Sequence, residues 1–392
     1  MADLEGSESG YESFIEAASA PISSGCHGKA AMEDINMDDI SMSGFSKESV
    51  AQSILDYEYE NGRRYHSYRS GAYFAPNDEK QYHAIDLFHH VHRLVNGGEL
   101  CRTRLENPRK ILDIGTGTGV WAIEMADLFP EAEVVGIDLS PVNTDWKPSN
   151  CTFEIDDVES EWVRPENYYD FIYSRCMFGC ISDWPAYINR IYTHCEPGGK
   201  VEFTEVVMPY RADNQPPNSA MAYWCKNGSI ASEMFGKPFS GVAENLEMWV
   251  RNAGFVNVKV RKVKIPVGTW PKDPKQKLIG HFQLLGTFEG MEGFTLALWS
   301  RVLGYPIEHI QEVLKAVERE LKDPSIHWWY LMYYVTAEKP KVVRSPRPHQ
   351  PEEPQWWNSH PKGYQDADAV SMKTTDSELL QRQFEQSFRM TD

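Results

Sequence analysis

Three alternating glycines, Gly115, Gly117 and Gly119, carry the clearest chemical meaning in this sequence of 392 residues. They follow a β-branched and aliphatic run at 110–114 and lead directly into a helical pattern at 120–126. A strand, a glycine turn and a helix in this order form a cradle for a nucleotide-like ligand, because glycines lack the Cβ atoms that would keep a ligand away from the backbone. The turn therefore predicts a cofactor site, although several cofactors use such a turn.

The residues that flank the turn narrow the choice of cofactor. A dinucleotide fingerprint has its third glycine at the sixth position, where this sequence has Val120. A carboxylate at Asp113 would repel a pyrophosphate, but it can pair with the α-amino group of S-adenosylmethionine, which carries no phosphate. These two residues favour S-adenosylmethionine and disfavour an NAD-dependent oxidoreductase. The alternative without a ligand is a hydrogen-bonded turn aspartate in an ordinary α/β sheet.

Acidic residues also follow the next two predicted strands. The strand at 132–138 ends in Asp138, which is suited to accept hydrogen bonds from both hydroxyls of a ribose. The strand at 151–155 is followed by Asp156 and Asp157, which are suited to an adenine amino group. Because ligands of an open parallel sheet bind outside the carboxyl ends of its strands, we expect these acids to share one site.

A fourth predicted strand, at 169–174, leads into Arg175 at the same edge of the sheet. We therefore include this arginine in the predicted cofactor site. The full set of predicted cofactor-binding residues is Asp113, Gly115, Thr116, Gly117, Gly119, Asp138, Asp156, Asp157 and Arg175.

The residues that would carry the reaction itself are harder to identify. A sulfonium methyl group is already activated, so the protein must align the acceptor and keep water out. An oxygen or nitrogen acceptor can also need a base. Four residues are candidates, although each histidine among them fits a surface or packing role better: His83, Tyr73, Glu205 and His281.

Two parts of the sequence resemble a known family. Residues 113–119, with the acids after the two following strands, look like the glycine motif of class I S-adenosylmethionine-dependent methyltransferases. Residues 60–66 and 71–79 resemble, more narrowly, an upstream block of the fungal LaeA-like group. The resemblance covers roughly residues 57–340.

The resemblance implies an α/β fold with a Rossmann-like, seven-stranded sheet, helices on both faces, an antiparallel last strand and a helical cover over the substrate pocket. It implies one methyltransferase domain at 49–340, with a helical N-terminal lid and a helical insertion at about 275–322. The activity it implies is methylation of a small-molecule intermediate in fungal secondary metabolism. The alternative is a LaeA-type nuclear regulator that acts through protein partners.

Two departures from the group favour a paralogue over the regulator itself. The segment after the upstream block has Ala84 where the group commonly has an arginine. In addition, Thr116 stands where the regulator often has a cysteine.

The elements that must position the site can be predicted from periodicity and from turn residues. The pattern is helical over about 49–98 and stops at the glycines of 96–98. The remaining expected elements are a strand at 200–207, a helix followed by a loop within 216–238, a helix at 244–253, a strand at 256–265, helices at about 275–302 and 306–322, and a strand at 328–335.

Composition excludes several other functions. The net charge of −18 argues against direct binding of nucleic acid, because phosphate-binding surfaces need clustered Lys and Arg. The basic run at 259–264 alternates with valines, which fits the solvent side of an edge strand. Seven scattered cysteines indicate reduced thiols, and the spacing of Cys176 and Cys180 is a poor metal signal, so we expect no metal.

We also expect no membrane segment, because no apolar run reaches the length of a span. The first residues lack the features of a secretory signal. The expected location is therefore the cytoplasm, with the nucleus as the alternative.

The two ends of the chain differ from the body in composition. Residues 1–48 are acidic and lack periodicity, which predicts disorder. Residues 341–392 begin as a proline-rich linker and end with apolar residues at intervals of four, namely Leu380, Phe384 and Phe388. This spacing predicts a short amphipathic helix that docks on the body of the protein or on a protein partner, with a disordered tail as the alternative.

Overall fold

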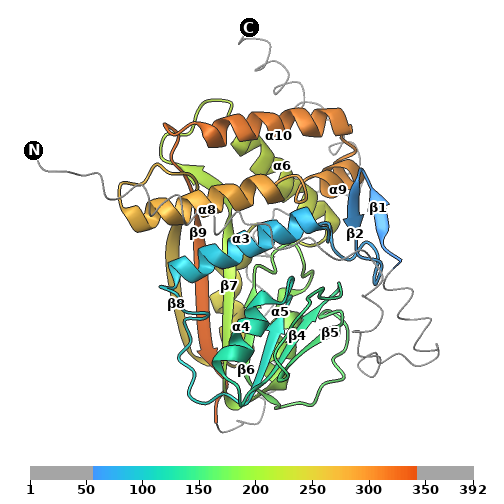
Figure 1. Ribbon diagram of the computed structural model, residues 1–392, viewed down its shortest axis with the longest axis vertical. Helices are drawn as coiled ribbons and strands as arrows, with labels where there is room; N and C mark the ends of the chain where they lie inside the picture. Colours follow the sequence, from blue (N-terminus) through green and yellow to red (C-terminus); the bar gives the residue numbers. More distant parts are fainter. Residues whose placement is uncertain (1–55, 342–392) are drawn as a thin grey trace, which may run out of the picture. The chain divides into compact units, whose positions relative to one another are not determined.

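The computed structural model describes residues 56–341 (Figure 1). The predicted acidic segment at 1–48 lies outside the described residues, as does the predicted C-terminal linker and helix apart from Lys341. Among residues 56–341, no helix is long and apolar enough to cross a membrane.

A seven-stranded mixed sheet forms the centre of the described structure. Strand β9 is antiparallel to both of its neighbours, β7 and β8, whereas the other neighbouring strands are parallel. In their order across the sheet, the strands are β5 (Cys151–Ile155), β4 (Glu133–Asp138), β3 (Lys110–Ile114), β6 (Tyr169–Arg175), β7 (Cys195–Ala212), β9 (Trp328–Glu338) and β8 (Val256–Pro266). This arrangement confirms the predicted fold class, including the antiparallel last strand.

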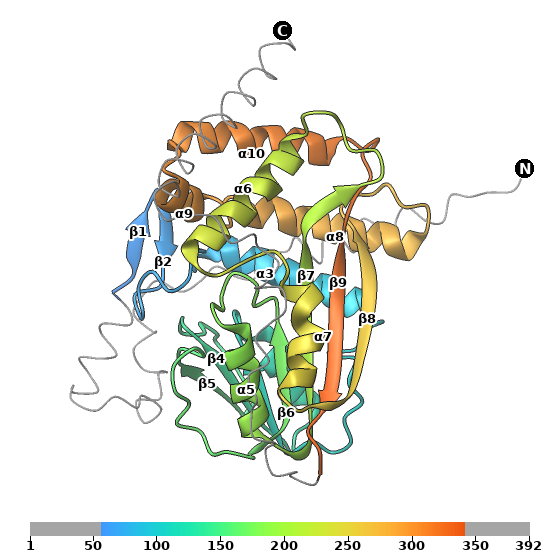
Figure 2. The same ribbon diagram turned by 180° about the vertical axis from the view of Figure 1, so that it is seen from behind.

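Helices cover both faces of this sheet. On one face lie α3 (Glu79–Val95) and α4 (Val120–Leu128), and on the other lie α5 (Trp184–His194) and α7 (Val242–Asn252), as comparison of Figures 1 and 2 shows. The strands of a parallel sheet are apolar on both sides because helices exclude water from both. Consistent with this, Ile111 packs in the core beneath α4 and Leu112 in the core beneath α5 and α7.

Further helices form a cover beyond the carboxyl ends of the strands (Figure 1). They are α6 (Ala220–Phe235), α8 (Pro274–Gly290), the short α9 (Leu296–Leu298) with the π-helical turn at Trp299–Leu303, and α10 (Ile307–Lys322). The helix predicted over 275–302 is therefore interrupted between α8 and α9. Helices α3 and α8 pack closely, since a Cβ atom on Gly290 would lie 3.3 Å from that of Ala84. This close approach leaves no room for an arginine at position 84.

The continuous helical pattern predicted over 49–98 is wrong for residues 58–65, and its first residues, 49–55, lie outside those described. Strands β1 (Glu58–Glu60) and β2 (Arg63–Tyr65) form an antiparallel hairpin, and within residues 56–341 the first helix is α3. The turn between the strands is Asn61-Gly62, with φ of 51° and 76°. Asn-Gly favours these left-handed conformations in two-residue hairpins, so the signal was present in the sequence. Asp78 then caps α3 by accepting a hydrogen bond from the Gln81 amide at 3.0 Å.

Candidate functional site

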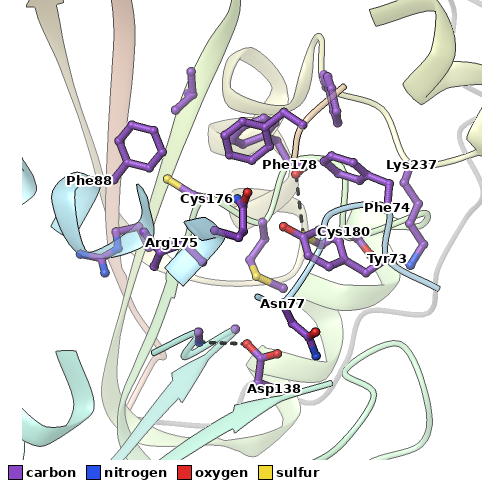
Figure 3. Close-up of a pocket in the computed structure, with 18 of the residues that line it drawn as sticks. Tyr73, Phe74, Asn77, Phe88, Asp138, Arg175, Cys176, Phe178, Cys180 and Lys237 are labelled. Carbon is purple, nitrogen blue, oxygen red and sulfur yellow. Dashed lines mark hydrogen bonds between the residues drawn. The ribbon is translucent and has the colours of Figure 1, made fainter. Parts of the chain in front are cut away.

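A cavity of about 250 Å³ lies between the carboxyl ends of the parallel strands and the helical cover. Figure 3 shows its lower part, where the glycine turn meets Asp138, and its upper part, where aromatic side chains gather. Seven of the predicted cofactor residues line the cavity: Gly115, Thr116, Gly117, Asp138, Asp156, Asp157 and Arg175. The turn and the acids after the next two strands are therefore brought to one place by the parallel sheet.

Asp138 is the best-defined polar group of the cavity floor. Its Oδ2 accepts a hydrogen bond from the Gly117 amide at 2.9 Å, and its Oδ1 accepts one from the Ser140 amide at 3.0 Å (Figure 3). Burial raises the pKa of this carboxyl above its usual value, although the backbone donors oppose that rise. A carboxylate has about four acceptor positions, so both oxygens can still accept hydrogen bonds from ligand hydroxyls.

Gly115 and Gly119 of the turn must be glycine for two different structural reasons. Gly115 has φ of 68°, and a Cβ atom there would collide with the Met177 side chain at the cavity wall. Gly119 has φ of 78° and begins α4, but it does not line the cavity. A Cβ atom on Gly119 would lie 2.6 Å from the ring of Phe153 on β5. The first glycine therefore shapes the cavity, and the last allows the helix to pack on the sheet.

Asp113 lies behind the turn and is not part of the cavity wall. Its side chain accepts a hydrogen bond from the Thr116 hydroxyl at 2.6 Å and is 4% exposed. Burial raises the pKa of Asp113 to about 6. This carboxyl therefore supports the turn from within the protein, and its pairing with a ligand amino group stays a prediction.

Asp156 and Asp157 reach the cavity from the loop after β5. The Asp156 carboxylate pairs with Arg164 at 2.7 Å. The Asp157 carboxylate accepts hydrogen bonds from the Glu159 amide at 2.9 Å and the Ser160 hydroxyl at 3.0 Å. Both acids are thus held in place by local partners.

The four catalytic candidates are not brought together. Tyr73 lines the cavity, where burial holds the pKa of its hydroxyl well above the usual value. His83 is exposed on α3, and His281 is partly buried on α8 outside the cavity wall. Glu205 is buried beneath the loop after β6, where it accepts hydrogen bonds from the amides of Met177 at 2.8 Å and Phe178 at 3.1 Å. Burial raises the pKa of Glu205 to about 8.

Several residues of the cavity wall were missed by the sequence analysis. Asn77 lies next to Asp138 and donates a hydrogen bond from Nδ2 to the Ser140 hydroxyl at 3.1 Å (Figure 3). Gln81 and His89 on α3 also line the cavity. Asn77 lies in the upstream block that carried the family resemblance and Gln81 lies just after it, which was the available signal, whereas His89 lies ten residues beyond the block. Among residues 56–341, no group of acidic, histidine and cysteine side chains could hold a metal ion.

The arrangement fits S-adenosylmethionine and the class of enzymes that use it. The backbone of the turn is open to a ligand at Gly115 and Gly117, and the half-buried Asp138 carboxylate has free acceptor positions beside it. The sheet has the strand order and the antiparallel β9 of class I S-adenosylmethionine-dependent methyltransferases. Fold and site together therefore define a methyltransferase.

A family model and two relatives in sequence agree with this class. A family model described as a methyltransferase domain matches residues 79–260. The chain is 40% identical to methyltransferase pytC of Aspergillus terreus, over 74% of this chain and 91% of that protein. It is 35% identical to the secondary metabolism regulator LAE1 of Cochliobolus heterostrophus, over 72% of this chain and 94% of that protein. A solved structure of phosphoethanolamine N-methyltransferase 2 from Haemonchus contortus, in complex with S-adenosylmethionine, matches at 16% identity and a TM-score of 0.43, over 79% of this chain and 75% of that one.

The chain belongs to the family of S-adenosylmethionine-dependent methyltransferases that includes pytC and the LaeA-type proteins. Its cofactor is S-adenosylmethionine, as predicted from the turn.

Proposed function

We propose that this enzyme methylates a small, largely apolar molecule of fungal secondary metabolism. The observation that supports this proposal is an aromatic chamber above the cofactor part of the cavity. We use this name for six cavity-lining side chains: Phe74, Phe178, Trp224, Phe239, Phe294 and Trp299. Such a wall suits a planar or hydrocarbon-rich acceptor, because binding sites for small molecules are mainly apolar with few polar groups.

The aromatic chamber is assembled from segments far apart in the sequence. The ring of Phe239 lies 5.2 Å from that of Phe74 and 5.5 Å from that of Phe178, measured between centroids. Trp224 on α6 is held in place by a hydrogen bond from its indole N–H to the Thr295 hydroxyl at 2.7 Å. These contacts surround the acceptor space with rigid side chains, which supports alignment of an acceptor and exclusion of water.

Polar groups in the wall indicate that the acceptor also carries a hydrogen-bonding group. The Gln81 side chain is 1% exposed, and neither atom of its amide has a hydrogen-bond partner among the described residues. An unpaired buried amide costs free energy, so a hydroxyl or carbonyl of the acceptor would stabilise it. On another wall, the Tyr330 hydroxyl donates to Gln283 Oε1 at 3.0 Å.

The residues of the wall suggest how a proton could leave the acceptor. When bound, S-adenosylmethionine supplies an activated methyl group, so an oxygen or nitrogen acceptor needs only alignment and loss of its proton. Two histidines line the cavity, and both ring nitrogens of His89 are engaged by other side chains. Nδ1 of His92 has no partner among the described residues. Burial, with help from Arg175, holds the pKa of His92 well below its usual value, so this ring is uncharged, and the tautomer with its proton on Nε2 presents a lone pair at Nδ1.

A labelling experiment tests the proposal. Purified full-length protein is incubated with S-adenosylmethionine carrying a deuterated methyl group and with the small-molecule fraction of a fungal culture extract. We expect mass spectrometry to find the label in one small molecule or a few related ones. The Asp138→Asn variant serves as the control that lacks the cofactor contact.

The alternative function is that of a regulator, which the identity of 35% with LAE1 supports. In that case the label would enter polypeptides and no small molecule, and deletion of the gene would change several unrelated metabolites. Loss of a single metabolite on deletion would support the biosynthetic proposal.

We further propose a cytoplasmic location, because the acidic sequence contains no convincing basic run for nuclear import. Microscopy of a fluorescent fusion tests this location, and accumulation in the nucleus would favour the regulator. A docking role for the C-terminal tail concerns residues outside those described and stays a prediction.

A further inference from the structure

Arg175 is a cation at the cavity wall without an acidic partner. It is the last residue of β6, one position beyond the pair formed by Ser174 and Ile114, so it lies beside the start of the glycine turn. Within residues 56–341, Arg175 forms no ion pair, and its hydrogen-bond partner is Nδ1 of His89, which lies 3.3 Å from both Nη1 and Nη2. Figure 3 shows Arg175 on the side of the cavity opposite Lys237.

A carboxylate brought by a ligand would complete this arrangement. A charge shielded from water is costly unless it is paired and hydrogen-bonded. The nearby Asp113 is already bonded to the Thr116 hydroxyl and lies outside the cavity wall, so it does not serve as that partner. A guanidinium group offers two parallel N–H donors to a carboxylate. The amino-acid part of S-adenosylmethionine carries such a group.

His89 determines how the guanidinium is oriented. Arginine always donates, so Nδ1 of His89 must accept, and the ring proton is then on Nε2. Nε2 lies 3.0 Å from Oε2 of Glu124 and donates to it. Glu124 also accepts a hydrogen bond from Arg93 at 2.5 Å. The chain of contacts from Glu124 through His89 therefore fixes one tautomer and directs one acceptor atom at Arg175.

We infer that Arg175 binds the α-carboxylate of S-adenosylmethionine and that His89, held by Glu124, is the positioning residue for this contact. The inference concerns the cofactor, so it goes beyond the proposed function and does not depend on the identity of the acceptor.

Calorimetry with two ligands tests the inference on the full-length protein. S-adenosylhomocysteine carries the carboxylate, whereas 5′-methylthioadenosine shares the adenosine but lacks the amino-acid part. We expect Arg175→Gln and His89→Leu each to weaken the binding of S-adenosylhomocysteine about 10- to 100-fold, which is the scale of a lost charged hydrogen bond. Neither variant should change the affinity for 5′-methylthioadenosine.

Two further variants separate positioning from a general structural effect. His89→Asn keeps an acceptor near the place of Nδ1, so it should restore part of the affinity lost in His89→Leu. His90→Gln is the matched control, because His90 is the next residue of α3 and packs on Phe282 outside the cavity wall. It should leave both affinities unchanged.

Two outcomes would overturn the inference. Equal losses for both ligands would show that the variants disturb the turn or the fold. Unchanged affinity for S-adenosylhomocysteine in Arg175→Gln would show that the guanidinium does not bind the cofactor carboxylate. The methyl acceptor would then remain as the ligand of Arg175. Failure of the proposed small-molecule function would alter neither affinity, so the two failures are distinguishable.

Discussion

Replacement of Asp138 by asparagine tests the cofactor site most directly. The carboxylate faces the cavity, and each of its oxygens accepts one hydrogen bond from a backbone amide, that of Gly117 or that of Ser140. An asparagine has one acceptor oxygen and an NH₂ group, so one of these amides would face another donor. The charge that strengthens hydrogen bonds from the ribose hydroxyls is lost as well. Hydrogen bonds to charged groups contribute about 1.5–3 kcal/mol. We therefore expect Asp138→Asn to weaken the binding of S-adenosylhomocysteine roughly 10- to 150-fold.

The assay combines calorimetry with thermal unfolding. At a ligand concentration 100 times the wild-type Kd, binding stabilises the folded protein by about 2.7 kcal/mol, whereas a variant that binds about 30-fold more weakly gains about 0.9 kcal/mol. The rise in Tm on adding S-adenosylhomocysteine should therefore be much smaller in Asp138→Asn than in the wild type.

Asp170 provides the matched control for this substitution. It also accepts two backbone amides, from Arg109 at 2.5 Å and Lys110 at 3.2 Å, but it does so at the opposite ends of β3 and β6. Asp170→Asn should lower the stability of the protein without changing the affinity for the ligand. A Kd of Asp138→Asn within twofold of the wild-type value would refute the ribose assignment.

Three other predictions concern the turn, the buried acid and the proposed base. In urea unfolding, Gly119→Ala should destabilise the protein by about 1–3 kcal/mol more than Gly97→Ala. Both glycines have a left-handed φ, but only at position 119 would the added Cβ atom collide with a ring, that of Phe153. Equal losses of stability in the two variants would contradict this reasoning. Glu205 has a pKa raised from 4.5 to about 8, so the folded state holds a proton that the unfolded state releases, and stability should fall as the pH rises between these values. The slope is at most about 1.4 kcal/mol per pH unit and should be absent in Glu205→Gln; an unchanged slope in the variant would show that another group is responsible. Replacement of His92 by glutamine should lower kcat and leave the Kd of S-adenosylhomocysteine unchanged; full kcat would exclude His92 as the proton acceptor.

Local signals made much of the fold predictable. The strands were apolar runs bounded by turn residues, and the glycine turn required backbone conformations that favour glycine. The hairpin at β1 and β2 was missed because a helical pattern was extended across Asn61-Gly62, although that pair favours a two-residue turn. The antiparallel β9 came only from the family resemblance, since the neighbours of a strand in a sheet are not encoded in its own periodicity.

The site was less predictable because its members come from distant parts of the chain. Asp138 could be placed from the sequence, because parallel strands bring their carboxyl ends to one edge. The position of Asp113 behind the turn depends on which way its side chain points once the sheet is packed. Glu205 lies within β7, where it accepts hydrogen bonds from the amides of a neighbouring loop and is not at the cavity wall.

The sequence by itself determined the class of cofactor, because a strand, a glycine turn and an acid after the next strand are defined by local spacing. Only the tertiary structure decided what surrounds that cofactor. The contact between His89 and Arg175 joins residues 86 positions apart, and the aromatic chamber joins Phe74 to Phe294. The first pair forms because α3 packs over the end of β6, and the second forms because the segment before α3 meets the segment after α8 where these two helices pack together. This packing depends on whole helix faces. Recognition of the acceptor is therefore a property of the folded chain, whereas recognition of the cofactor begins in a short segment.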